Sequence, residues 1–186
     1  MLSAGANWPV PDDLKTYLID VDVLARIHVR QDSAAIYDAL IEMAQRGRLR
    51  TVRQTFDELK QFGPQYALLK PHRETFQISI DKQFDPRVSA YIETLGNNAP
   101  YLWEQTGGAK NPDPADPWIV AVAATYRWTV VTNESPKSPV RIPAACKHPK
   151  IDCRCIRGPH FLVEVRIVTE VKPEHIDPAL FFNEGE

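Results

Sequence analysis

The chain has 186 residues, of which 44% are hydrophobic and 25% charged, a composition that suits one soluble globular domain. Its formal net charge of -2 does not favour a nucleic-acid binder overall, although local basic patches would still allow one. The longest apolar run, WIVAVAATY, is too short to cross a bilayer, and the N-terminal segment lacks the pattern of a secretory signal. An odd number of cysteines, three, gives no complete disulfide framework. We therefore expect a cytoplasmic protein with reduced thiols and no membrane association.

The first half of the chain alternates strand and helix patterns after an extended, proline-rich arm over residues 1–14. Residues 16–21, TYLIDV, are short, apolar and rich in β-formers, which predicts a buried strand. Residues 33–47 have apolar side chains at helical spacing and predict a helix. Residues 48–52 predict a second strand, and a second helix is expected to begin near Thr55.

The middle of the chain continues this alternation after one ambiguous segment. Residues 64–81 are ambiguous, because ETFQISID within them alternates like a strand. Residues 85–98 predict a helix that opens with Asp-Pro. Residues 116–127 open in the same way and are apolar nearly all round, which predicts a buried helix with Asp116 as its N-cap. Residues 128–134 predict a strand that ends in polar residues.

The last part, residues 135–186, is expected to contribute a closing strand and a C-terminal extension to the same domain. A proline-rich connection with a short helix near its end precedes the strand pattern IDCRCI at residues 151–156. Residues 160–168 fit a helix or a strand equally well. Because strands and helices alternate throughout, we expect one α/β domain over residues 1–186 with a mainly parallel sheet.

Acidic residues follow the predicted strands, where an open parallel sheet forms its sites. Asp20 and Asp22 end the first strand, and Glu58 is placed in the first turn of the helix after the second. Asp116 opens the buried helix, and Glu134 follows the strand TVVT. Each acid has a simpler interpretation: a helix cap, a partner of the helix dipole or a solvated loop residue. Their convergence is harder to explain in that way, because clustered carboxylates repel and are usually offset by Mg²⁺ or Mn²⁺.

Three sequence segments resemble the motifs of PIN-domain nucleases. YLIDVDVL resembles their opening strand, and TFDEL resembles their second motif. DPWIVAVAATYRWTVVTNE resembles their third and fourth motifs, an acid opening an Ala-rich helix and then a strand running into Thr-x-acid. The order and approximate spacing agree from Thr16 to Glu134. Two positions depart from the family pattern: Glu134 stands where Asp is usual, and Asp22 where Asn or Ser is usual.

The resemblance implies a three-layer fold, with helices on both faces of a mainly parallel sheet, and a metal-dependent ribonuclease. Many small bacterial members are VapC-type toxins, so the resemblance extends to a toxin with an antitoxin partner and leaves a homodimer open. It implies hydrolysis of RNA that leaves a 5′-phosphate and a 3′-hydroxyl. Thr132 and Asp22 are expected accessory residues. The catalytic residues, which would also bind Mg²⁺ or Mn²⁺, are by position Asp20, Glu58, Asp116 and Glu134.

Two other functions fit parts of the pattern. DVDVL also resembles the opening of haloacid-dehalogenase-type phosphatases, with Lys110, Asp113 and Asp116 as further groups. That interpretation leaves Glu58 and VVTNE without a role. A non-catalytic PIN scaffold that binds RNA or protein is the second alternative.

Two further clusters invite functional interpretations. The cysteines and histidines between residues 146 and 160 do not match common zinc spacings, and small buried hydrophobic residues explain the cysteines better. We expect the basic clusters to be ordinary solvent-exposed residues, although either cluster could bind the phosphates of an RNA backbone. The basic residues are Arg46, Arg48, Arg50 and Arg53 in one cluster and Lys147, Lys150, Arg154 and Arg157 in the other.

Overall fold

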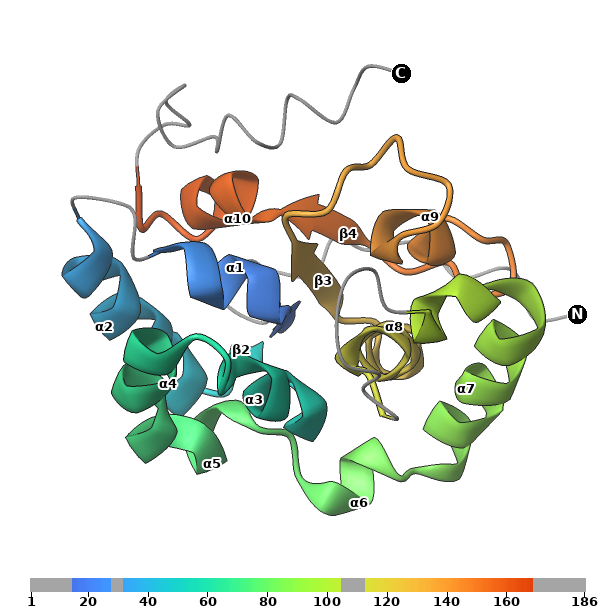
Figure 1. Ribbon diagram of the computed structural model, residues 1–186, viewed down its shortest axis with the longest axis horizontal. Helices are drawn as coiled ribbons and strands as arrows, with labels where there is room; N and C mark the ends of the chain where they lie inside the picture. The colour runs from blue at the N-terminus through green and yellow to red at the C-terminus, as the bar shows by residue number, and fades with distance from the viewer. Residues whose placement is uncertain (1–14, 28–31, 105–112, 169–186) are drawn as a thin grey trace, which may run out of the picture.

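A central sheet of four parallel strands organises the molecule (Figure 1). The computed structural model describes residues 15–27, 32–104 and 113–168, so the expected N-terminal arm and the end of the C-terminal extension lie outside the described residues. The strand order is β2-β1-β3-β4. Because every neighbouring pair is parallel, the sheet confirms the expected α/β class. The strands are β1 (Tyr17–Ile19), β2 (Leu49–Arg50), β3 (Thr129–Thr132) and β4 (Cys155–Arg157).

Helices connect the strands and cover both faces of the sheet. Two short 3₁₀ helices, η3 (Lys70–His72) and η4 (Pro100–Trp103), also lie between β2 and β3. The helices are α1 (Val21–Arg26), α2 (Ser33–Gln45), α3 (Arg53–Leu59), α4 (Gly63–Leu69), α5 (Arg73–Phe76), α6 (Ile80–Gln83), α7 (Pro86–Asn98), α8 (Ala115–Tyr126), α9 (Ile142–Cys146) and α10 (Gly158–Glu164).

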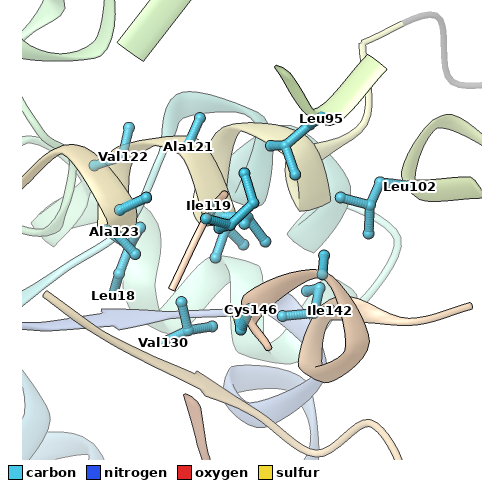
Figure 2. Packing of buried hydrophobic residues seen from close by; sticks show 14 of the residues in the cluster. Leu18, Leu95, Leu102, Ile119, Ala121, Val122, Ala123, Val130, Ile142 and Cys146 are labelled. Atoms are coloured by element: carbon cyan, nitrogen blue, oxygen red, sulfur yellow. The ribbon is translucent and has the colours of Figure 1, made fainter. Parts of the chain in front are cut away.

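Two hydrophobic cores lie on opposite faces of the sheet, because successive side chains of a strand point to opposite sides. Leu18 and Val130 belong to the core formed with α7, α8 and α9, which Figure 2 shows from close by. Tyr17, Ile19 and Val131 belong to the other core, with α1, α2, α3 and α10. The chain therefore forms the three layers expected from its sequence, with helices on both faces of the sheet.

Helix α8 is the buried helix that its apolar sequence predicts. Eight of its residues are buried, and it ends at Tyr126, with Arg127 as a C-cap in a left-handed conformation with φ 56°. The helix begins at Ala115, so its N-cap is Pro114, two residues before the expected Asp116. Asp116 is thus in the first turn and is not the N-cap, which corrects the expectation from the sequence.

The structure revises three other boundaries. Helix α3 begins at Arg53, so Glu58 lies in its second turn instead of its first. The ambiguous residues 64–81 are mainly helical, and only Gln77 forms an isolated bridge, to Thr51. The predicted strand over residues 151–156 is confined to β4, so Cys153 precedes it.

Candidate acidic site

Asp20 lies at the carboxyl end of β1, where it is only 3% exposed. It is the N-cap of α1 and accepts a hydrogen bond of 2.6 Å from the Val21 N–H. The register pairs Ile19 with Val131, which brings the next residue of each strand to the same edge. The Thr132 hydroxyl consequently lies 3.0 Å from Asp20 Oδ2 and donates a hydrogen bond to it. Thr132 therefore fixes the Asp20 carboxylate, and its expected accessory role in positioning a water molecule or a phosphate oxygen stays a prediction.

Asp22 lies beside Asp20 in the first turn of α1 and is held by the backbone that follows β3. The Asn133 N–H lies 3.2 Å and 3.0 Å from its two carboxylate oxygens. Asn133 is buried, and its Oδ1 accepts a hydrogen bond of 3.2 Å from the Gly158 N–H. A Cβ atom at Gly158 would lie 2.7 Å from the same oxygen, so the close approach requires glycine. The sequence alone did not identify Asn133 or Gly158, whose only signal was their position after a strand.

Glu134 extends from the end of β3 toward α9. Its Oε2 accepts a hydrogen bond of 2.7 Å from the Ile142 N–H, and its Oε1 lies 3.4 Å from the guanidinium of Arg141. Arg141 therefore offsets part of the charge of Glu134. The Ile142 amide and the Arg141 guanidinium thus each contact one oxygen of the Glu134 carboxylate and position it.

Glu58 connects α3 to the start of α8. Its Oε1 accepts a hydrogen bond of 2.8 Å from the Ala115 N–H. Glu58 thus satisfies an amide at the helix N-terminus, a task that the sequence suggested for Asp116. Because Glu58 accepts from this amide, helix capping does not explain why an acid stands at position 116.

The pKa shifts of the acids indicate that their carboxyl groups lie close together. The pKa of Asp20 lies well above its ordinary value because of burial and the charges of Asp22, Asp116, Glu134 and Glu58. The pKa of Asp116 rises to about 8, first through burial and then through Glu134, Glu58 and Asp22. Burial also raises the pKa values of Asp22 and Glu134, although hydrogen bonds from Asn133 and Ile142 oppose the rise. Folding therefore concentrates acidic groups that would separate in water.

A divalent cation with oxygen ligands fits the chemistry of this acidic site. Its charge would offset the repulsion among the five acids, and carboxylates are its preferred side-chain ligands. In the part of the chain that the structure describes, no group of three or more His, Cys, Asp or Glu side chains is arranged to hold a metal ion. Backbone amides instead hold the carboxylates of Asp22, Glu58 and Glu134. Bringing three carboxylates around one cation would therefore require their side chains to move, although each carboxylate keeps lone pairs beyond those that accept from the amides.

Comparison with known proteins places the chain in a family. A family model described as a domain of unknown function (DUF4411) matches residues 17–167. The chain belongs to this family. The match extends over all five acids and every described strand, from β1 to β4. No curated protein matches the chain. The family description assigns no activity, so the acidic site itself has to support any functional conclusion.

The other candidate groups are mostly engaged elsewhere. Asp113 accepts hydrogen bonds from Trp118 Nε1 and Gln54 Nε2, both 2.7 Å long, and Lys110 lies outside the described residues. In the basic clusters, Arg46 pairs with Glu42 and Arg154 with Glu164. None of the helices in the described ranges has the length and apolar character needed to span a bilayer.

Proposed function

We propose that this protein is an endoribonuclease that hydrolyses RNA phosphodiester bonds with the help of Mg²⁺ or Mn²⁺. The observation that carries the proposal is the convergence of Asp20, Asp22, Glu58, Asp116 and Glu134 at one edge of the parallel sheet. The other four acids help to raise the pKa of Asp20, and Glu134, Glu58 and Asp22 help to raise that of Asp116. A divalent cation bound there would compensate several negative charges. The resemblance to PIN-domain nucleases, which rests on the same residues, supplies the reaction.

The proposed role of each residue follows from its contacts. Asp20 and Asp116 are central metal ligands, because Asp20 is buried at the strand end and Asp116 is not needed as a cap. Glu58 and Glu134 complete the set from the two sides. When bound, the cation would activate a water molecule and stabilise the negative charge that develops on the phosphate. Thr132 holds Asp20 in position through its hydroxyl.

The two alternative functions, a phosphatase and a non-catalytic scaffold, account for fewer of the observed contacts. A phosphatase of the haloacid-dehalogenase type would need Asp113, whose carboxylate is engaged by Trp118 and Gln54. It would also leave the contact between Glu58 and α8 unused. A non-catalytic scaffold would have no use for the repulsion among the acids, which opposes folding. A toxin that acts in the cytoplasm with an antitoxin, alone or as a homodimer, is a narrower form of the nuclease proposal.

RNA cleavage by the purified full chain tests the proposal. A mixed pool of single-stranded RNA is incubated with Mn²⁺, with Mg²⁺ or with excess EDTA, and the product ends are mapped. We expect cleavage only with a divalent cation, 5′-phosphate ends, and at least a hundredfold lower rate for Asp20→Asn. Asp38→Asn, which changes an exposed acid on α2, is the matched control and should cleave like the wild type. Cleavage that persists in EDTA or in Asp20→Asn would disprove the assignment.

A further inference from the structure

Three cysteines line one pocket beside the acidic site. Cys146 is the last residue of α9, Cys155 is the first residue of β4, and Cys153 lies just before that strand. The pocket has a volume of about 100 Å³, and Lys147 and Arg157 also line it. This pocket is distinct from the carboxylate cluster, although Thr132 and Glu134 border both.

The geometry brings Cys146 and Cys153 within reach of a covalent bond. The Cys153 N–H donates a hydrogen bond of 3.1 Å to the Cys146 carbonyl oxygen. This contact holds the two backbones side by side, and both cysteines line the same pocket, so the two residues are neighbours as a disulfide requires. The nearby thiols of Cys153 and Cys155, followed by burial, raise the pKa of Cys146 well above its ordinary value.

The two partners of Cys146 differ in their backbone freedom. Cys155 is fixed by the sheet, where it pairs with Val130. Cys153 belongs to no helix or strand, so it can adjust to the S–S torsion that a disulfide requires. Cys153 is half-buried, whereas Cys146 is 1% exposed in the core shown in Figure 2. An oxidant that approaches from solvent therefore meets Cys153 before Cys146.

We propose that Cys146 and Cys153 form a reversible disulfide, which makes the pocket a site of oxidation by small disulfides such as oxidised glutathione. The Cys153 thiolate attacks one sulfur of the small disulfide and releases one thiolate. The Cys146 thiolate then attacks the Cys153 sulfur and releases the second. The two protein thiols lose two electrons and two protons in total, and the small disulfide is reduced to two thiols. The positive charges of Lys147 and Arg157 attract an anionic oxidant of this kind.

The disulfide would form on the element that positions Glu134. Helix α9 has only five residues, and its first residue, Ile142, donates the hydrogen bond to the Glu134 carboxylate. Its last residue is Cys146. The oxidation site and the acidic site are thus joined by one short helix, while the proposal itself does not depend on nuclease activity.

Peptide mapping of the full chain gives a direct test, because cleavage after lysine and arginine places each cysteine on its own peptide. These peptides are residues 142–147, 151–154 and 155–157. The folded, reduced protein is equilibrated with mixtures of reduced and oxidised glutathione, alkylated, digested and analysed by mass spectrometry. We expect peptide 142–147 to be linked to 151–154 in most of the chains at the oxidising end, and the link to disappear after treatment with dithiothreitol.

Two variants identify the pair. In Cys155→Ser the link should persist, and in Cys153→Ser it should be lost, while circular dichroism confirms that both variants remain folded. A wild-type chain that links 142–147 only to 155–157 would overturn the assignment of Cys153. The absence of any linked peptide in fully oxidised glutathione, or a link that forms only in denaturant, would overturn the proposed oxidation site.

Discussion

Replacing the Asp116 carboxyl by an amide should stabilise the metal-free protein at neutral pH. The pKa of this carboxyl is about 8 in the folded chain, compared with an ordinary value of 3.8. Between these two values the folded state keeps a proton that the unfolded state has released. The free energy of unfolding consequently falls as the pH rises through this window, by about 1.4 kcal/mol per pH unit.

The size of the effect follows from the width of that window. Because pH 7 lies about three units above the ordinary pKa, the carboxyl lowers the free energy of unfolding by up to roughly 4 kcal/mol there. Asp116→Asn retains the shape of the side chain, and Glu58, not Asp116, accepts from the first amide of α8. The variant should therefore gain up to that amount at pH 7 and almost nothing near pH 4.

Urea unfolding in EDTA, followed by tryptophan fluorescence at several pH values, measures this difference. Asp38→Asn removes an exposed acid on α2 and is expected to follow the wild-type curve at each pH. If Asp116→Asn is no more stable than the wild type at pH 7, the repulsion that defines the acidic site does not act on this carboxyl, and the argument fails.

Three further changes test other parts of the site. Mn²⁺ at a hundredfold excess over its dissociation constant should raise the free energy of unfolding of the wild type by about 2.7 kcal/mol. In a thermal unfolding assay, Glu134→Gln should show a smaller gain on adding Mn²⁺. An undiminished gain would place Glu134 outside the metal site. Thr132→Val removes the hydrogen bond to Asp20, so calorimetry should show weaker Mn²⁺ binding, and unchanged affinity would exclude a positioning role. Gly158→Ala brings a methyl group against Asn133 and should lower stability in urea by about 1–3 kcal/mol; a neutral effect would mean that this contact is not tight.

The position of the acids was accessible from the sequence because parallel strands end at a common edge. Asp20 and Glu134 each follow an apolar strand pattern. Because alternating strands and helices predict a parallel sheet, the ends of these two strands are expected at the same edge. The same rule explains why the α/β class and the parallel sheet were predicted correctly. These predictions depend on the local spacing of apolar residues, which can be read from one sequence without knowledge of distant contacts.

The remaining features depend on contacts between distant residues. Glu58 caps a helix that begins 57 positions later in the chain, so sequence spacing could not reveal that it takes the role suggested for Asp116. Residues 74–81 alternate locally like a strand, yet Phe76 is buried against α2 and α3 in a helical segment. The link between Asn133 and Gly158 spans 25 positions, and it exists only because β3 and β4 are neighbours.

The rate of RNA cleavage by Glu58→Gln in Mn²⁺ tests the central claim most directly. This substitution removes one charge from the acidic site and leaves an oxygen that can still accept the hydrogen bond from Ala115. The exposed residue Glu74 provides the matched control, Glu74→Gln. A metal-dependent nuclease built on this cluster predicts cleavage by the wild type and the control, and a loss of at least a hundredfold in Glu58→Gln without loss of folding. Full cleavage by folded Glu58→Gln would contradict the account.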